Sequence, residues 1–537
     1  MPFLRKEKKK SGTYLRIVES YRDDKGKSRH KTLHNLGKAE NYSKQTLKNI
    51  SKAFLELAGE TLPDKNPLKE LARLNYGFVM VYDKIMKIYG LDKLFRKIAK
   101  KKNLSYDVYR HVLLMLAERL NDPASKLSNY HHRLEYYGLD DIDLHNLYRS
   151  LDHLHDYQQE VQEIIYTQGR NLFNMELDVV FYDVTTFYFE SQMEDGFRME
   201  GFSKDGKIGK TVIVFGLLID SNKNPVGYKV YRGGFWEGHT FQDALKKLKQ
   251  QYRIGKVIMV ADRGMMSRNN IELTEESGYE FIIGERLKNL PKKIVEQIFD
   301  RSQYRPIEVE NEENGDMVTL EYQIIEHRGK RLIATYSRRR AKKDRFEREK
   351  RIEKGKQMML KPSQSERKAR RYYLKNEGDN KYELDERKIE ADSRFDGFVC
   401  IATNNRELGV EKILSSYKQL YKIEHSFRTF KSYLETRPMF HWTQERIEGH
   451  LCLCYIAFTL LHYLQKTMQA VGSRFSENRI REALDKMQLS LVEQFDEEFY
   501  MRSAQKEDAT AILGALKLKK IPDLTPKPAI SNYISIG

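Results

Sequence analysis

Cysteine is scarce in this chain. Only three cysteines, Cys400, Cys452 and Cys454, occur among its 537 residues. Three thiols cannot cross-link a protein of this size, so a secreted scaffold held by disulfides is excluded and free thiols in a reducing compartment are expected. The length exceeds what one hydrophobic core supports, so we expect roughly two to four domains.

Long hydrophobic runs are absent as well. The first ten residues, MPFLRKEKKK, lack the apolar stretch of a secretory signal peptide. The most apolar run, Leu451 to Leu464, is too short to span a bilayer and contains a histidine, so it predicts a buried core helix. His450, Cys452 and Cys454 lie close enough in sequence to suggest zinc, but on an apolar helix a core position is favoured. We therefore expect a cytoplasmic protein.

Acidic residues are too few to balance the basic ones. The chain has 95 Lys and Arg against 77 Asp and Glu, a net charge of +18. Residues 1–50 hold 14 of the basic and 5 of the acidic residues, which is half of the net charge. A basic excess of this size favours a polyanionic partner, and nucleic acid is favoured over membrane because no lipid-binding segment is present. The alternative for these first residues is a solubilising tail.

The chain has no internal repeat, but its pattern changes along its length. Residues 12–38 alternate in polarity around an Asp-Asp-Lys-Gly turn and predict a small β-unit, whereas about 67–174 is helical in periodicity throughout. From 176 onward, apolar strands alternate with helices, which predicts an α/β fold with a mixed sheet. The charged run 337–392 indicates either solvent-exposed helices or DNA contacts. The expected regions are a basic arm with the β-unit (1–62), an all-α region suited to gripping DNA (63–174), an α/β core (175–287 and 395–470), a segment of β-strands and charged helices within that core (288–394), and a helical C-terminal tail (471–537).

Two aspartates each end a predicted apolar strand. Asp183 ends the strand 176–183, and Asp262 ends the strand 256–262. The carboxyl ends of strands in α/β sheets are where binding sites tend to form. Each aspartate alone is weak evidence, because many such residues merely cap a turn or a helix.

A third carboxylate, Glu424, lies in a predicted helix among basic and aromatic residues. At about 100° per residue, Tyr417, Leu420, Glu424 and Lys431 would form one stripe, with Arg428 one turn beyond Glu424. Such a stripe suits a metal ligand beside cations and a phenol that contact phosphates. The alternative is an ordinary ion pair between Glu424 and Arg428 at i,i+4.

Three carboxylates in a strongly basic chain indicate phosphodiester chemistry. Cleavage needs a nucleophilic water or hydroxyl and a leaving oxygen whose charge is stabilised. Two hard divalent cations about 3.5–4 Å apart serve both needs, and carboxylate oxygens hold them. The residues therefore predict two metal ions acting on a DNA backbone.

At these residues the chain resembles DDE-type transposases of bacterial insertion sequences, in the group with a Tyr-x2-Arg-x3-Glu-x6-Lys signature. Tyr417, Glu424 and Lys431 match it, but the arginine position is Leu420, for which Arg428 or Lys418 could compensate. Further similar blocks span about 176–465: FYDVTTFYFE, GFSKDGK, VADRGMMS, DGF with IATN, and RPMFHWTQERIEGHL.

The resemblance implies an RNase H-like core with a mainly β insertion between the second aspartate and the glutamate. It implies Asp183, Asp262 and Glu424 as catalytic metal ligands for two Mg²⁺ (or Mn²⁺), and Tyr417, Arg428 and Lys431 as DNA contacts. Members of the family act as dimers on paired element ends and join 3′-hydroxyls to target DNA, so a nucleoid-associated protein is expected. Two alternatives remain: a metal-dependent nuclease without strand transfer, and a non-catalytic DNA-binding regulator derived from such an enzyme.

Overall fold

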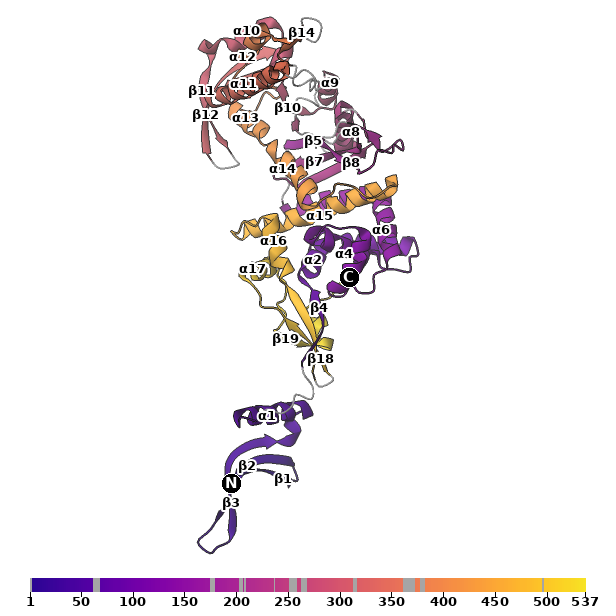
Figure 1. The fold of residues 1–537 in the computed structure, drawn as a ribbon, viewed down its shortest axis with the longest axis vertical. Coiled ribbons are helices and arrows are strands. Elements are labelled where there is room, and N and C mark those ends of the chain that lie inside the picture. Colours follow the sequence, from indigo (N-terminus) through magenta and orange to yellow (C-terminus); the bar gives the residue numbers. More distant parts are fainter. Residues whose placement is uncertain are drawn as a thin grey trace. The chain divides into compact units, whose positions relative to one another are not determined.

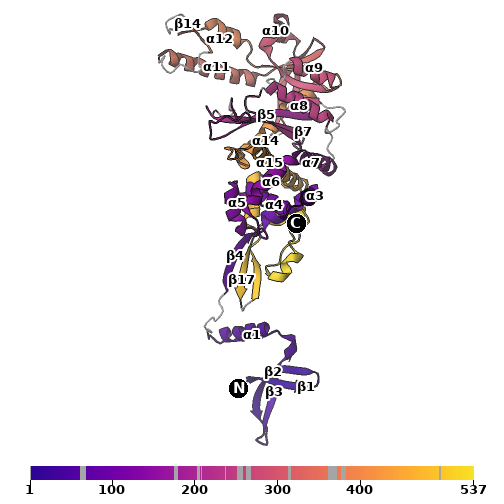
Figure 2. The ribbon, with the colours of Figure 1, turned by 90° about the vertical axis from the view of Figure 1, so that its right-hand side faces the viewer.

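The computed structural model describes most of the chain (Figures 1 and 2). The described residues are 2–60, 68–173, 179–201, 206, 209–235, 237–250, 258–261, 268–311, 316–360, 372–376, 382–494 and 497–537. The chain divides into two compact units. One unit comprises Met1–Leu74, Leu489–Ser503 and Ile521–Tyr533, and the other Asn75–Gln488, Ala504–Lys520 and Ile534–Gly537.

The first unit contains two small sheets. One has the order β1-β2-β3 and is followed by helix α1 (Lys44–Leu57), whose N-cap Ser43 accepts a hydrogen bond from the amide of Thr46. The other has the order β19-β18-β17-β4. The strands are β1 Pro2–Lys9, β2 Gly12–Arg22, β3 Ser28–Lys38, β4 Lys69–Asn75, β17 Gln488–Gln494, β18 Glu497–Arg502 and β19 Leu524–Pro526.

These strands confirm one expectation and correct two. The β-unit expected at 12–38 is present, with an additional strand at Pro2–Lys9. The prediction of helix throughout 67–174 is wrong at Lys69–Asn75, and the prediction of a purely helical tail is wrong because β17, β18 and β19 lie there. The segment LKELARLN has helix-like spacing of its leucines, but its strand forms by pairing with β17, some 400 residues away in sequence, and local periodicity cannot register such a partner.

In the second unit, helices from the N-terminal half pack around one long apolar helix, α15 (Gln444–Ala470), which lies between them and the sheet (Figures 1 and 2). The crossing with α6 is so close that a Cβ on Gly449 would lie 2.0 Å from the carbonyl oxygen of Leu151. Among described residues, α15 alone is long and apolar enough to cross a membrane, but 89% of its apolar window is buried inside the protein. It is the predicted core helix. The packing helices are α2 Gly77–Tyr89, α3 Leu91–Lys101, α4 Val108–Asn121, α5 Lys126–His132, α6 Leu144–Asp156 and α7 Gln158–Phe173.

The predicted mixed sheet is present in the second unit and has ten strands. Its order is β11-β12-β13-β16-β10-β9-β5-β7-β6, with β8 paired to β7. β9 runs parallel to both β5 and β10, and the other described pairs are antiparallel. The strands are β5 Val179–Tyr188, β6 Met199–Glu200, β7 Thr211–Asp220, β8 Pro225–Tyr231, β9 Ile258–Ala261, β10 Glu280–Glu285, β11 Arg305–Asn311, β12 Asp316–His327, β13 Lys330–Tyr336 and β16 Phe398–Thr403.

Helices cover both faces of this sheet. Val180, Tyr182 and Val184 of β5 share a core cluster with Phe241 and Leu245 of α8 (Glu237–Gln250). The opposite face receives α13 (Val410–Lys418) against β10 and α14 (Tyr421–Arg428) against β5. Because strand side chains alternate between faces, Asp183 is on the α14 side.

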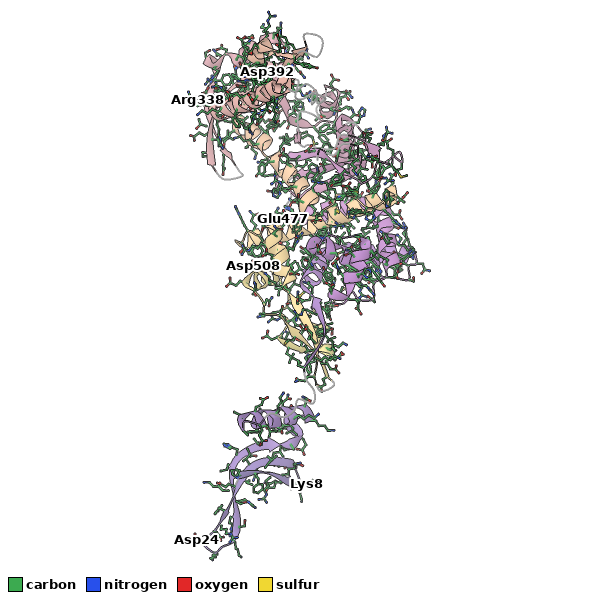
Figure 3. All side chains as sticks on the ribbon, viewed as in Figure 1. Lys8, Asp24, Arg338, Asp392, Glu477 and Asp508 are labelled. Carbon is green, nitrogen blue, oxygen red and sulfur yellow. The ribbon has the colours of Figure 1, made fainter. Side chains whose placement is uncertain are left out.

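The segment between β10 and β16 adds three strands and several helices. β13 pairs with β16, and the other edge of β16 pairs with β10, so the added strands continue the same sheet. Helix α11 (Arg338–Leu360) begins at Arg338, and Asp392 lies on α12 (Glu386–Ser393) (Figure 3). The same segment contains α10 Lys292–Phe299, β14 Leu374–Asn376 and β15 Tyr382–Leu384.

Three further helices lie outside this segment. They are α9 Arg268–Glu276, α16 Glu477–Asp485 and α17 Glu507–Ala515.

Candidate active site

Asp183 lies in the middle of β5, not at its end. The strand continues to Tyr188, so the prediction that it stops at residue 183 is wrong. The continuation VTTFY is rich in β-branched and aromatic residues, and it pairs with β7 as far as Tyr188. The carboxylate is half-buried, and its Oδ1 accepts a hydrogen bond of 2.7 Å from the amide of Val184. The ladder on β7 therefore holds Asp183 in a fixed register.

Asp262 lies outside the described residues. The strand before it, β9, is described from Ile258 to Ala261 and runs parallel to β5. In that pairing Ala261 is opposite Tyr182, the residue that precedes Asp183.

The helix predicted for 410–434 is divided into three segments. They are α13, α14 and a π-helix, η7 (Thr429–Tyr433). Between α13 and α14, the amides of Leu420 and Ile423 donate to carbonyl oxygens three residues earlier, at 3.2 Å each. Bonds of this spacing wind the chain more tightly than an α-helix does.

After α14 the winding becomes wider. The amide of Leu434 donates to the carbonyl of Thr429, five residues earlier, at 2.9 Å. A stripe calculated at 100° per residue does not hold across a tight turn followed by a π-turn. The prediction that Tyr417, Leu420, Glu424 and Lys431 form one stripe is therefore wrong for Lys431, which lies in η7.

A cavity of about 660 Å³ nevertheless brings distant parts of the chain together. Asp183 from β5 and Glu424 from α14 both line it. Tyr417, Lys418 and Leu420 line the same cavity, whereas Arg428 and Lys431 are not among its lining residues. Burial lowers the pKa of Lys418 from its ordinary value.

Glu424 is exposed to this cavity. In the part of the chain that the structure describes, its carboxylate has neither a hydrogen-bond nor an ion-pair partner. The alternative of an i,i+4 ion pair with Arg428 is therefore not realised. An acidic oxygen that faces a cavity without a protein partner can accept an external cation.

Tyr417 is fixed by a close approach to the sheet. A Cβ on Gly284 of β10 would lie 2.2 Å from the Tyr417 hydroxyl oxygen, so the ring fits only because residue 284 has no side chain. Val399 of the neighbouring strand β16 lines the same cavity as Tyr417. The tyrosine at the signature position is thus packed against the strand that follows β9 in the sheet.

Sequence reasoning missed Arg340. This residue lies in the first turn of α11 and lines the cavity that contains Asp183 and Glu424. The only available signal was its place in a charged run, and that signal did not distinguish Arg340 from its neighbours Arg338 and Arg339.

The oxygen donors of the cavity fit a hard divalent cation. Carboxylate oxygens are the ligands that Mg²⁺ and Mn²⁺ prefer in proteins. Among described residues, no group of three or more His, Cys, Asp and Glu side chains is clustered to hold a metal. The third predicted ligand, Asp262, lies outside that set. Cys400, Cys452 and Cys454 are free, as the sequence predicted, and all three are buried, which confirms the core positions predicted for Cys452 and Cys454.

Two family models match this chain. Residues 4–62 match the family described as IS1634 family transposase, N-terminal domain, and residues 175–460 match the one described as Transposase DDE domain. No curated protein matches the chain. A piggyBac transposase, solved in a synaptic complex with hairpin DNA, is 12% identical over 76% of this chain and 78% of its own, with a TM-score of 0.38, too low to establish a common fold. Because the DDE domain covers more than half of the sequence, the chain belongs to the DDE transposases of insertion sequences, which are metal-dependent enzymes acting on DNA.

Proposed function

We propose that this transposase hydrolyses the DNA strand at the ends of its insertion sequence and joins the freed 3′-hydroxyl to target DNA. The proposed metal ligands are Asp183, Asp262 and Glu424, holding two Mg²⁺ (or Mn²⁺). The observation that carries the proposal is the cavity shared by Asp183 and Glu424, which come from a strand and a helix far apart in sequence. A regulator without catalysis would have no need to keep these carboxylates together.

The place of Asp262 in the proposal follows from chain connectivity. Ala261 is opposite Tyr182 in the parallel ladder, and consecutive Cα atoms are about 3.8 Å apart. Asp262 and Asp183 are each one residue beyond that pair, so their carboxylates are candidates to share a metal ion.

The fold proposal rests on strand order. Part of the sheet has the order β8-β7-β5-β9-β10. Its strands β8, β7 and β5 pair antiparallel, and β9 and β10 run parallel to β5. We assign this to the RNase H-like core that the sequence resemblance implies. Residues 288–394 are then the insertion, entering after β10 and returning at β16.

Each group has a distinct proposed role. Two bound cations would activate the attacking water or hydroxyl and stabilise the leaving oxygen. The carboxylates of Asp183, Asp262 and Glu424 would hold and orient them. Tyr417, Arg428 and Lys431 would contact backbone phosphates on the α13–α14 side. Arg428 and Lys431 would do so outside the cavity lined by Asp183 and Glu424, here called the carboxylate cavity.

The remaining parts are proposed to hold and pair the DNA ends. Residues 1–62 carry much of the positive charge and match the N-terminal domain of the family. Together with the helical region 63–174, they are the proposed binding site for terminal inverted repeats. A homodimer on paired ends, in the cytoplasm at the nucleoid, completes the proposal.

The test uses linear DNA carrying the sequences that flank the gene, incubated with Mg²⁺ or Mn²⁺. Asp183→Asn removes a metal ligand and no phosphate contact, so cleavage should be abolished while DNA binding persists. Asp485→Asn makes the same chemical change at an exposed position of α16 and should cut normally. Joined products would separate a transposase from a simple nuclease. Equal loss of binding and cutting in Asp183→Asn would overturn the assigned role.

A further inference from the structure

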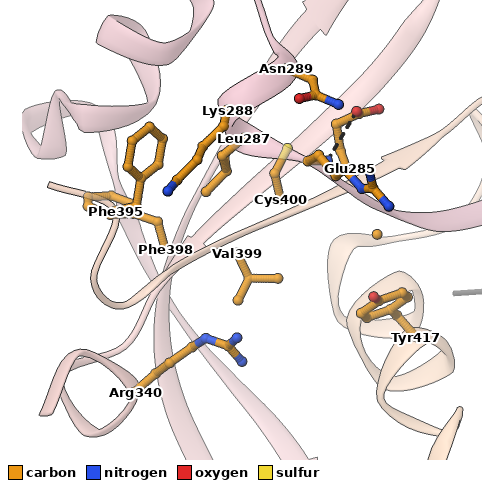
Figure 4. A pocket seen from close by; sticks show the side chains of 12 residues that line it. Glu285, Leu287, Lys288, Asn289, Arg340, Phe395, Phe398, Val399, Cys400 and Tyr417 are labelled. Atoms are coloured by element: carbon orange, nitrogen blue, oxygen red, sulfur yellow. Dashed lines mark hydrogen bonds between the residues drawn. The ribbon is translucent and has the colours of Figure 1, made fainter. Parts of the chain in front are cut away.

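A second cavity, of about 470 Å³, adjoins the one that holds the carboxylates (Figure 4). The two share three lining residues: Arg340, Val399 and Tyr417. In Figure 4, Arg340 reaches in from α11 on one side and Tyr417 stands on α13 on the other, with Val399 between them. The two cavities therefore border each other along an edge formed by an arginine, a valine and a tyrosine.

The beginning of α11 is anchored so that Arg340 is held at this junction. The amide of Ser337 donates to the carbonyl of Gly397 at 3.1 Å, and the amide of Gly397 donates to Oδ2 of Asp344 at 3.0 Å. Arg348 forms an ion pair with Asp396. These bonds tie the first turns of the helix to the turn that enters β16.

Gly397 makes that anchor possible. Its φ is +85°, and a Cβ there would lie 2.8 Å from side-chain atoms of Ala341 and Tyr336 and 2.9 Å from the carbonyl oxygen of Ser337. A residue with a side chain would push α11 away from β16. The Asp-Gly-Phe block therefore positions Arg340.

Arg340 is available to a ligand. Its ion-pair partner is Asp344, at 3.5 Å, and 53% of its side-chain surface remains exposed. By contrast, Lys288 on the far wall of the second cavity is bound to both Asp392 and Tyr372. A guanidinium stays charged at all working pH values and binds phosphate oxygens in pairs, which suits it to a DNA backbone.

We propose that Arg340 binds a backbone phosphate of the DNA strand held at Asp183 and Glu424. The strand then continues between Arg340 and Tyr417 into the second cavity, where Phe395 and Phe398 offer apolar surface. This inference rests on the proposed function, because it takes the scissile phosphate to lie at the carboxylates. It assigns a cation to a site whose signature arginine is replaced by Leu420.

The test is a scan with uncharged phosphates. DNA ends are made with a single methylphosphonate at each position near the cut, and binding is measured with Asp183→Asn protein so that the DNA stays intact. One position should weaken binding roughly tenfold, the size of a lost charge-assisted hydrogen bond. In protein that also carries Arg340→Ala, the same position should have no further effect, because the partner is already gone.

Arg339→Ala is the matched control. It removes the same charge from the adjacent, exposed position of α11, and Arg339 lines neither cavity. Arg340→Ala should reduce the slope of log affinity against log salt by about one, and Arg340→Lys should restore part of the binding. The inference is overturned if Arg340→Ala keeps the methylphosphonate sensitivity, or if both alanine variants behave alike with unchanged melting temperatures. Cutting by Asp183→Asn would overturn the proposed function instead, whatever the scan shows.

Discussion

Charged groups lie in two contrasting surroundings in the second unit. In the helical region, Glu118, Lys126 and Asn129 form a buried polar cluster, and the partly exposed His132 adjoins it. Lys126 Nζ donates to Asn129 Oδ1 at 3.1 Å, Asn129 Nδ2 donates to Glu118 Oε2 at 2.9 Å, and His132 Nδ1 lies 3.0 Å from the same oxygen. In the carboxylate cavity, the Glu424 side chain has no partner among the described residues.

The contrast separates polar groups that stabilise the fold from a carboxylate to which the proposed function assigns a metal ion. Buried polar atoms are costly to leave unsatisfied, so the cluster provides its own partners. An exposed carboxylate keeps its water when it has no protein partner, and it can exchange that water for a metal ion. Substitutions in the two places should therefore affect different measurements.

The largest effect is expected at Glu424, where Glu424→Gln should break catalysis alone. We expect metal-dependent cleavage to fall roughly a thousandfold or more, because the proposed metal ligand is lost. The melting temperature should stay the same, because an exposed side chain with no partner among the described residues contributes little to stability. Glu411→Gln, at an exposed position in the first turn of α13, is the control for cutting. A large fall in melting temperature would mean that Glu424 is structural after all.

An intermediate effect is expected from Asn129→Ala, which should show the opposite pattern. Truncation removes the hydrogen-bond acceptor of Lys126 and leaves Glu118 with His132 as its remaining partner in this cluster, at a cost of about 1–3 kcal/mol of unfolding free energy. Cleavage per folded molecule should be retained. Chemical denaturation measures the first quantity, and a cutting assay at low temperature measures the second.

Gln469→Ala provides the comparison for that variant. It removes an exposed amide in the last turn of α15, so its unfolding free energy should match that of the unaltered protein. Equal stability of the Asn129 and Gln469 variants would contradict the role given to the polar cluster.

The smallest effect is a pH dependence at Lys126. Burial, reinforced by nearby Arg119, lowers the pKa of Lys126 to about 7, while Cys454 and Glu118 act in the opposite direction. Below pH 7 the lysine is charged in both the folded and unfolded states. The full free-energy cost of burying that charge then lowers the stability of the folded state. Between pH 7 and the ordinary lysine pKa, the folded state is neutral and the unfolded state still binds the proton, so this contribution to stability rises with pH.

Lys126→Met sharpens that prediction by keeping the length of the side chain without its charge. The melting temperature of the variant relative to the unaltered protein should be highest below pH 7 and should decline as the pH rises from 7 to 9. A constant difference across that range would show that the folded-state pKa of Lys126 is not lowered.

The sequence predicted the scaffold of the site better than its details. The strands that carry Asp183 and lead to Asp262, and the helices near Glu424, were visible in local hydrophobic patterns. The sheet then brings Asp183 and Glu424 together as expected. The strands and helices were predictable because each depends on residues near one another in the chain, whereas the meeting of Asp183 and Glu424 was implied by the resemblance to a family.

What the sequence did not predict depends on distant partners or on backbone winding. Arg340 joins the site because Gly397 and Asp396 hold α11 in place, an arrangement made by residues about 50 positions apart. The tight turn at Leu420 and the π-helix after Arg428 leave no signature in hydrophobic spacing, since side-chain type varies little with such small changes in winding. The strand β4 was missed because its partner, β17, is distant in sequence.

The sheet that joins the inserted segment to the core also limits how the enzyme can move. β16 is hydrogen-bonded along one edge to β10 and along the other to β13, so the strand that leads into α11 belongs to the same sheet as β5 and β9. Swinging the insertion away would require a whole ladder of hydrogen bonds to break. Under the proposed function, the distance between the DNA contact on α11 and the carboxylate on β5 is therefore set by this hydrogen-bonded sheet.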